Sequence, residues 1–549
     1  MKDSNYWRDM EWRRLLGGRL SRRRLIQIGA AGSAGALAFA AGCGGGEDDD
    51  AGGESTTSPR ETAVAGSPKY GGKITIASNA AVSSLDPAIW SLGSDKYVTY
   101  NVYDWPATEG TDQAGDLTIL PNLAESFEWV DNTHLVFRWR QGIKFHDGTD
   151  FNSDAIQAYY QRVLDPATKS PRAAELRTLD HVEGPDLYSS VYVLKEPDAV
   201  VAGLTLSFWT SCIPSPAAAD LARNPVGTGP FVFKSQQPGA SYELAKNPDY
   251  WRPGEPYLDG YAVRVIPDKA VAAAALKAGE VDYVAYLETR DIARFRQDAG
   301  FNVVTQGVGA RKVYINNNRG ACKDERVRKA LSLAVNRQEF IDRYAGEAFI
   351  TPGPLVKGGT YANPDEPDPE DDPEQARHLL AAAGYADGLE FEKLYTTTEP
   401  ADQTDAEVLQ AQWAKVGVKV NVDYVAIAQA GVRLATGDYE LALGGAFGEG
   451  DDYELRNVYH SKGVFNAGTL TDPGIDSLID SAKLALNPNE RKEIYWQVMK
   501  TIMEKTMAIF IVGVPQTVVL AKRVQGYAPD LAVKGEPRMQ FQWRKLWVS

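Results

Sequence analysis

The apolar and polar residues alternate with two different periods along the chain, and these periods predict strands and helices in turn. Residues 73–77 alternate with a period of two, which is typical of a strand with one buried face, and residues 135–139 form a second strand-like run that opens after the Asn132-Thr133 turn. Residues 418–425 show the same alternation directly after Gly417. These three segments are therefore predicted to be strands.

Other segments carry apolar residues every three or four positions and predict helices. A helix is expected over residues 150–164, with Asn152 or Ser153 as its cap, and a longer one over 325–344, capped by Asp324. Asp372-Pro373-Glu374 starts another helix, which should stop at Gly384. A further helix is expected over residues 406–415. Strands alternate with helices, so the predicted class is α/β with mixed sheets.

The first 43 residues follow a different pattern and predict an export signal. No charged residue occurs from Leu25 to Gly46, and Arg22-Arg23 stand just before this short run of small and apolar residues. The run is too short for a transmembrane span, and Arg22-Arg23 resemble a twin-arginine export signal. Ala40-Ala41-Gly42 precede Cys43 as in a lipobox, so Cys43 is predicted to be lipidated after residues 1–42 are removed. The alternative is an ordinary cleaved signal with an incidental cysteine.

The composition of the linker and the net charge of the chain limit the kinds of molecule that the protein can bind. Residues 43–69 are rich in Gly, Asp, Glu, Ser and Thr and predict a disordered linker behind the anchor. The full chain has a formal net charge of −15, and the predicted leader holds eight of its basic but only three of its acidic residues. Nucleic acid and anionic membrane surfaces would repel a protein this acidic. The predicted membrane contact is therefore the lipid group attached to Cys43.

Cysteine and histidine suggest no cofactor. Cys212 and Cys322 remain after the anchor, and the sequence leaves open whether they form a disulfide or two buried thiols. The five histidines are scattered without the spacing of metal ligands. No metal and no cofactor are therefore expected.

A set of short motifs resembles one family over nearly the whole chain from Tyr70 onward. Residues 144–155, Lys-Phe-His-Asp-Gly-Thr-Asp-Phe-Asn-Ser-Asp-Ala, resemble the signature of extracytoplasmic solute-binding proteins of ABC transporters, family 5, the peptide and nickel class. Other segments stand in the order of that family: 85–87, 121–127, 224–231, 246–251, 279–282, 326–331 and 372–385.

The motifs themselves are mostly structural in their chemistry. Asp147-Gly148 is a turn pair, with Phe145 and Phe151 as core anchors and His146 as a hydrogen-bonded turn residue. Residues 227–230, Gly-Thr-Gly-Pro, lack the Lys-Ser/Thr ending of a phosphate loop, and a chain reversal between lobes suits them better.

The resemblance implies a two-lobed periplasmic-binding-protein-like fold (type II, cluster C) with an extra subdomain in the first lobe. Hinge strands would join the lobes, which close over a solute. By motif order, lobe one is expected at 70–103, 227–312 and 511–549, the extra subdomain at 104–226, and lobe two at 313–510.

The resemblance also places a ligand site in lobe two. In peptide-binding members a carboxylate after a Gly-Trp pair holds the ligand's ammonium group; here the matching stretch, residues 444–453, lacks the Trp and offers Glu449, Asp451 and Asp452. These acidic side chains would bind a cationic amine of the ligand. The alternative is that they form a solvated acidic loop. The missing Trp puts peptide specificity in doubt.

Aromatic and basic candidates complete the predicted contacts. Arg433 precedes the acidic loop and would bind a ligand carboxylate, or form a salt bridge to Asp438 or Glu440. The aromatic candidates for stacking, each of which has packing in the core as its alternative, are Trp90, Tyr97, Tyr103, Trp105, Trp209 and Tyr286.

The expected function is that of a substrate-binding lipoprotein of an ABC importer, and not of an enzyme. It would act as a monomer outside the cytoplasmic membrane, capture an oligopeptide or similar small polar solute, and deliver it to the permease and ATPase complex. A ligand-sensing lipoprotein of the same fold is one alternative. An exported hydrolase is another, although no Gly-x-Ser-x-Gly, His-Glu-x-x-His or Ser-x-x-Lys motif occurs.

Overall fold

The structure is a computed structural model. It describes residues 67–89, 93–111, 117–201, 211–356, 361–445, 451–466, 468–527 and 543–549. The predicted signal, Cys43 and most of the linker lie outside this range. Within it, no helix combines the length and apolar character needed to cross a bilayer.

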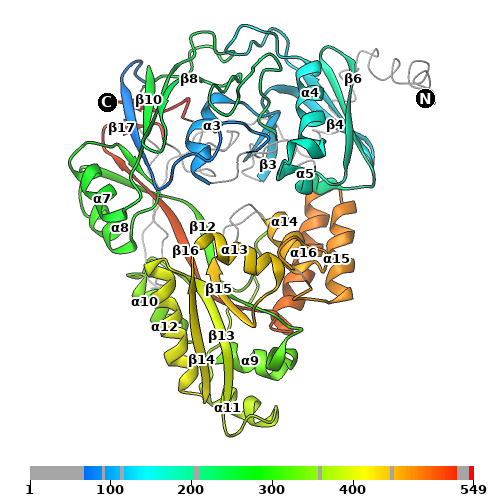
Figure 1. The fold of residues 1–549 in the computed structure, drawn as a ribbon, viewed down its shortest axis with the longest axis vertical. Coiled ribbons are helices and arrows are strands. Elements are labelled where there is room, and N and C mark those ends of the chain that lie inside the picture. The colour runs from blue at the N-terminus through cyan, green and yellow to red at the C-terminus, as the bar shows by residue number, and fades with distance from the viewer. Residues whose placement is uncertain are drawn as a thin grey trace, which may run out of the picture. The chain divides into compact units, whose positions relative to one another are not determined.

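A ten-stranded mixed sheet organises the fold, in the order β14-β13-β15-β12-β16-β11-β1-β10-β9-β8. Its two long central strands, β12 (Phe301–Ile315) and β16 (Ala508–Ala521), pair antiparallel along almost their whole length (Figure 1). One side of this pair holds β11 (Tyr283–Val284), β1 (Lys73–Ser78), β10 (Gly260–Val265), β9 (Ser241–Lys246) and β8 (Phe231–Gln237). The other side holds β15 (Leu441–Gly445), β13 (Leu389–Thr397) and β14 (Val418–Val425).

The chain passes from one side of the sheet to the other along β12 and returns along β16. The predicted lobe boundaries at 312/313 and 510/511 fall inside these two strands. The register between them shifts between Arg311 and Lys312, where Ile511 is left without a partner residue. Such an irregularity bends a strand and increases its twist.

A separate four-stranded antiparallel sheet lies within the stretch predicted as the extra subdomain. Its order is β4 (Ala124–Asp131), β5 (His134–Trp139), β7 (Ser189–Leu194) and β6 (Leu179–Asp186). The helix α4 (Ser153–Leu164) packs against it and contributes to a hydrophobic cluster that contains Trp139, Phe145 and Phe151. The two phenylalanines of the signature are thus core anchors, as predicted.

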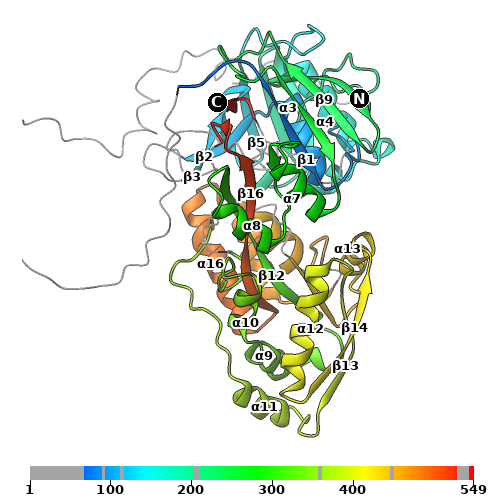
Figure 2. The same ribbon diagram turned by 90° about the vertical axis from the view of Figure 1, so that its left-hand side faces the viewer.

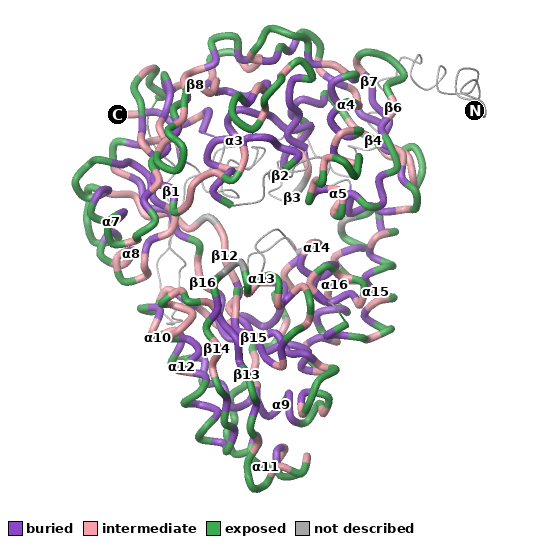
Figure 3. Tube along the Cα trace, viewed as in Figure 1, coloured by how far each residue is buried: buried purple, intermediate pink, exposed green. Residues whose placement is uncertain are grey.

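Helices and further strands complete the fold on both sides of the main sheet (Figures 1 and 2). Around the first half lie β2 (Ala107–Thr111), β3 (Leu117–Pro121), α3 (Lys96–Val102), α5 (Arg172–Glu175), α7 (Lys269–Lys277), α8 (Thr289–Arg296), β17 (Val524–Gln525) and β18 (Trp547–Val548). With β13–β15 lie α9 (Glu325–Leu333), α10 (Arg337–Arg343), α11 (Pro373–Ala382), α12 (Pro400–Ala414), α13 (Ile427–Thr436), α14 (Asp451–Glu454), α15 (Pro473–Leu484) and α16 (Pro488–Glu504). The buried residues follow the inner faces of these elements, and exposed ones the outer turns (Figure 3).

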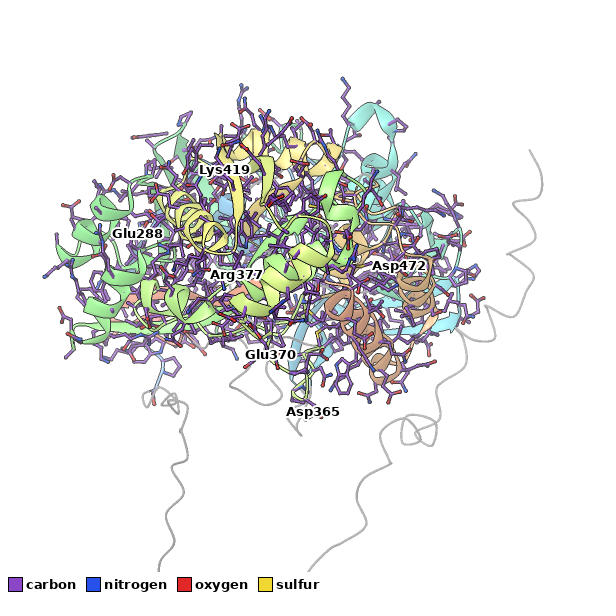
Figure 4. The ribbon with its side chains drawn as sticks, turned by 90° about the horizontal axis from the view of Figure 1, so that it is seen from below. Glu288, Asp365, Glu370, Arg377, Lys419 and Asp472 are labelled. Carbon is purple, nitrogen blue, oxygen red and sulfur yellow. The ribbon has the colours of Figure 1, made fainter. Side chains whose placement is uncertain are left out.

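Local sequence signals set most helix ends. The Asn152 side chain accepts hydrogen bonds from the N–H groups of Asp154 and Ala155 and caps α4, as predicted. Asp472, labelled in Figure 4, caps α15 in the same way and also pairs with Lys505. Because each cap occupies otherwise unpaired N–H groups of the first turn, these short polar residues fix where a helix begins.

Two helix predictions need correction. The single helix expected over 325–344 is two helices, because Asn336 accepts a hydrogen bond from Glu339 N and starts α10 afresh. The buried Arg337 guanidinium holds the break by donating to the carbonyl of Phe510 on β16. The helix expected over 406–415 begins at Pro400, six residues earlier than the apolar pattern indicated.

Candidate functional site

The signature turn is anchored to the 227–230 loop through His146. Its Nε2 lies 2.9 Å from the carbonyl oxygen of Gly229, and Gly227 N lies 3.5 Å from its Nδ1. Burial lowers the pKa of His146 to about 4, so the ring is neutral at pH 7 and donates to Gly229 while accepting from Gly227. The prediction of a hydrogen-bonded turn histidine is confirmed.

The glycines of the 227–230 loop are required by close packing on the end of α3. A Cβ on Gly227 would lie 2.1 Å from the carbonyl oxygen of Val102, and one on Gly229 would lie 2.5 Å from that of Asn101. Side chains are therefore excluded at both positions, and the loop binds backbone rather than phosphate.

The aspartate of the 85–87 motif also has a structural partner. Asp86 is buried and forms a two-point ion pair with Arg162 of α4, one arm of which is 2.9 Å from Nη1 to Oδ1. This pair ties the start of the first half to the subdomain helix. These three motifs thus hold parts of the fold together.

Most of the described aromatic candidates are packed in the core. Tyr103 has no exposed surface and donates its hydroxyl to the Leu85 carbonyl, and Trp105 donates its indole N–H to Cys212 Sγ at 3.2 Å. Tyr97 stacks on Trp543 at 6.1 Å between ring centroids. Tyr286 is half-buried and donates to the Ile266 carbonyl at 2.7 Å. These positions favour the core alternative, while Trp90 and Trp209 lie outside the described residues.

Arg433 and the cysteines each have a defined environment. Arg433 pairs with Asp423 at 2.6 Å, rather than with the two acids considered from the sequence, and lies over the Tyr395 ring. Cys212 and Cys322 are both free and buried, so the alternative of two thiols holds. Among the described residues, no group of three His, Cys, Asp or Glu side chains is arranged to hold a metal ion.

The segment that carries the predicted acidic loop is held at both ends by β12. Before the loop, the Tyr314 hydroxyl donates to the Gly445 carbonyl at 2.8 Å. After it, Glu454 at the end of α14 pairs with Lys312, whose side chain is completely buried. Glu449 lies outside the described residues, and Asp451 and Asp452 form the first turn of α14.

An ion pair that the sequence did not indicate joins this segment to the subdomain stretch. Arg456 Nη1 lies 3.3 Å from Asp198 Oδ2, and both side chains are buried. Asp198 also accepts from Thr178 Oγ1 and from the N–H groups of Val200 and Val201. The guanidinium nitrogens of Arg456 have no hydrogen-bond partner among the described residues. No sequence motif marks either residue, since their 258-residue separation closes only in the fold.

Solved structures share this architecture over most of the chain. A periplasmic binding protein from Helicobacter pylori, titled as ABC transporter-associated and in complex with the peptide STSA, superposes with a TM-score of 0.75 and 25% identity. The match covers 87% of this chain and 98% of that one. The mixed α/β fold of cluster C binding proteins is therefore confirmed.

Sequence relatives extend the same class. The di/tripeptide-binding protein 1 of Pseudomonas aeruginosa is 28% identical over 478 residues, covering 79% of this chain and 88% of the relative. The heme-binding protein A of Haemophilus influenzae is 28% identical, covering 75% and 82%.

The fold and these likenesses define a solute-binding protein that works outside the cytoplasm. Residues 118–466 match the family model of bacterial extracellular solute-binding proteins, family 5 middle region, and the chain belongs to this family. Its members are non-catalytic, so the chain is the substrate-binding protein of an ABC importer and not an enzyme.

Proposed function

We propose that this protein captures a short peptide, or a small polar solute of similar size, between the two halves of its main sheet. The observation that carries the proposal is the buried contact of Arg456 with Asp198, which brings the β15–α14 segment against the subdomain stretch. A solute held beside this segment would be shielded from water, as binding proteins require.

The relatives support this ligand class, because one is named for di- and tripeptides and the similar solved structure holds a tetrapeptide. A second relative is named for heme, so the shared fold accommodates other solutes. The acids of residues 444–453 favour a ligand with a free amine, since an opposite charge is strongly attracted where water is excluded.

The leader supports a cellular setting at the outer face of the membrane. Export through the twin-arginine route, lipidation of Cys43 and a flexible linker would keep the binding domain near the membrane face where the permease opens. The protein would pass its solute to the permease and ATPase complex as a monomer.

Titration calorimetry against panels of di- to pentapeptides, oligosaccharides and metal chelates tests the proposal, together with small-angle scattering of the free and loaded protein. One site per chain and a smaller radius of gyration with peptide are expected. Heat only from the oligosaccharide or chelate panel, or no compaction with any ligand, would contradict it.

A further inference from the structure

Arg311 lies on β12 where the chain crosses between the two halves of the main sheet, and it forms the centre of an ion cluster. Its Nη2 lies 2.8 Å from a carboxylate oxygen of Asp402 and 2.7 Å from one of Asp405, both on α12. The Asp405 side chain has no exposed surface, and those of Arg311 and Asp402 are 13% and 14% exposed. Burial lowers the pKa of Arg311, but the two acids and Tyr344 raise it above its ordinary value, so the guanidinium stays charged.

Both acids of the cluster also bind residues of other elements. Asp405 accepts hydrogen bonds from Arg343, the last residue of α10, and from the Tyr344 hydroxyl at 2.9 Å. Asp402 accepts a hydrogen bond from the hydroxyl of Thr397, the last residue of β13. The cluster therefore joins β12 to the end of α10 and to residues 397–402, which we call the β13–α12 turn.

The β13–α12 turn lies at the carboxyl edge of three parallel strands. β13 pairs parallel with both β14 and β15, and Arg311 is paired with Gly445, the last residue of β15. Helix α12 packs against β13 and β14 (Figure 2). In open α/β sheets, ligands bind outside the carboxyl ends of the strands. Thr398 and Pro400 of the turn are exposed, so the turn presents a free surface at this edge.

A buried ion cluster of this kind is a poor way to gain stability, because hydrophobic residues of similar volume often stabilise a fold as well or better. What the cluster supplies is a fixed geometry, since one planar guanidinium holds two carboxylates three residues apart on α12.

We propose that Arg311 is a positioning residue for solute binding: through Asp402 it holds the β13–α12 turn against β12 in the conformation that the solute contacts. The proposal rests on the proposed function, because it assumes that a solute bound between the two halves of the sheet lies at this edge.

Replacing Arg311 separates this role from folding, because both acids keep other partners. In Arg311→Met, Asp405 keeps its two partners at the end of α10, and Asp402 keeps the Thr397 hydroxyl. Helix α12 should therefore stay folded while the turn loses its tie to β12. If the turn is then competent to bind in only about one molecule in ten, the apparent Kd rises about tenfold.

The experiment measures the Kd of the tightest peptide of the panel for Arg311→Met, Asp402→Ala, the double variant and Tyr344→Phe in the full chain. Tyr344→Phe is the matched control: it removes a hydrogen bond from the same Asp405 but leaves the contact of Arg311 with Asp402, so its Kd should change less than about threefold. Because Arg311 acts through Asp402, the double variant should bind within about threefold of Asp402→Ala. Additive losses in the double variant, or an equal loss in Tyr344→Phe, would overturn the positioning role.

Amide hydrogen exchange without ligand separates this inference from the proposed function. Amides of residues 398–404 should exchange at least about tenfold faster in Arg311→Met than in the wild type, and at the wild-type rate in Tyr344→Phe. If no panel member binds the wild type, the proposed function fails, while the exchange rates still decide whether Arg311 holds the turn. Unchanged exchange in Arg311→Met, or faster exchange with wild-type affinity, would overturn the inference.

Discussion

The Arg456–Asp198 pair should set how tightly the two halves hold a solute, and the two partners should contribute unequally. In Asp198→Asn the guanidinium loses its one acidic contact and stays buried without a hydrogen-bond partner among the described residues. Removing one partner of a buried ion pair costs about 3–5 kcal/mol. In Arg456→Met, Asp198 keeps its hydrogen bonds from Thr178, Val200 and Val201, so the cost should be only about 1–2 kcal/mol.

A contact that forms only when the two halves meet stabilises the closed, ligand-bound state alone, so each substitution should destabilise that state and not the open one. Asp198→Asn should then weaken peptide binding by roughly two to three and a half orders of magnitude and Arg456→Met by about tenfold, since each 1.4 kcal/mol is a factor of ten. The unliganded protein should keep its melting temperature in both variants. Titration calorimetry and differential scanning calorimetry measure the two effects separately.

A second ion pair serves as the control. Arg296 of α8 pairs with Glu347 through two bonds of 2.8 Å, but both side chains are partly exposed to water. Exposed pairs contribute about 0.2–1 kcal/mol, so Arg296→Met should weaken binding less than about fivefold. The reasoning is refuted if Asp198→Asn binds as well as the wild type, or if its loss of affinity is matched by a loss of unliganded stability.

Three further outcomes are expected. Burial lowers the pKa of His146 from about 6.5 in the unfolded chain to about 4, so the stability that its neutral ring contributes is present above pH 6.5 and is lost as the pH falls toward 4. In urea titrations, His146→Gln should reduce the change in the free energy of unfolding over this pH range by about 2–3 kcal/mol. Gly227→Ala should lower the free energy of unfolding by about 2 kcal/mol or more through the clash with Val102, whereas Gly431→Ala, in a helix with open space, should raise it slightly. Cys43→Ala should release the protein from membranes in cell fractionation with peptide affinity intact; a variant that stays bound would contradict the lipid anchor.

Much of the fold was accessible from the sequence because its signals are local. The caps Asn152, Asp324 and Asp372 each accept hydrogen bonds from the first turn of the helix that they were predicted to start. The strand predicted over 418–425 is β14, with the same ends. Alternation and capping act within a few residues, so a single sequence displays them.

The parts that the sequence did not show depend on distant residues. The break at Asn336 is stabilised by a contact of Arg337 with β16, more than 170 residues away. The pairs of Lys312 with Glu454 and of Arg456 with Asp198 likewise join segments that no periodicity relates. An aromatic ring can stack on a ligand or pack in the core, so its residue type alone does not separate the two roles; the burial of Tyr103 and Trp105 favours packing in the core.

Native mass spectrometry of the purified protein mixed with a library of di- to pentapeptides tests the central claim most directly. The account predicts that one peptide binds per protein chain. The bound peptide should be selected from the library, and it should stay bound when the protein is far more dilute than the free peptides. Protein without any bound peptide, or several bound peptides in proportion to their concentrations in the library, would contradict it.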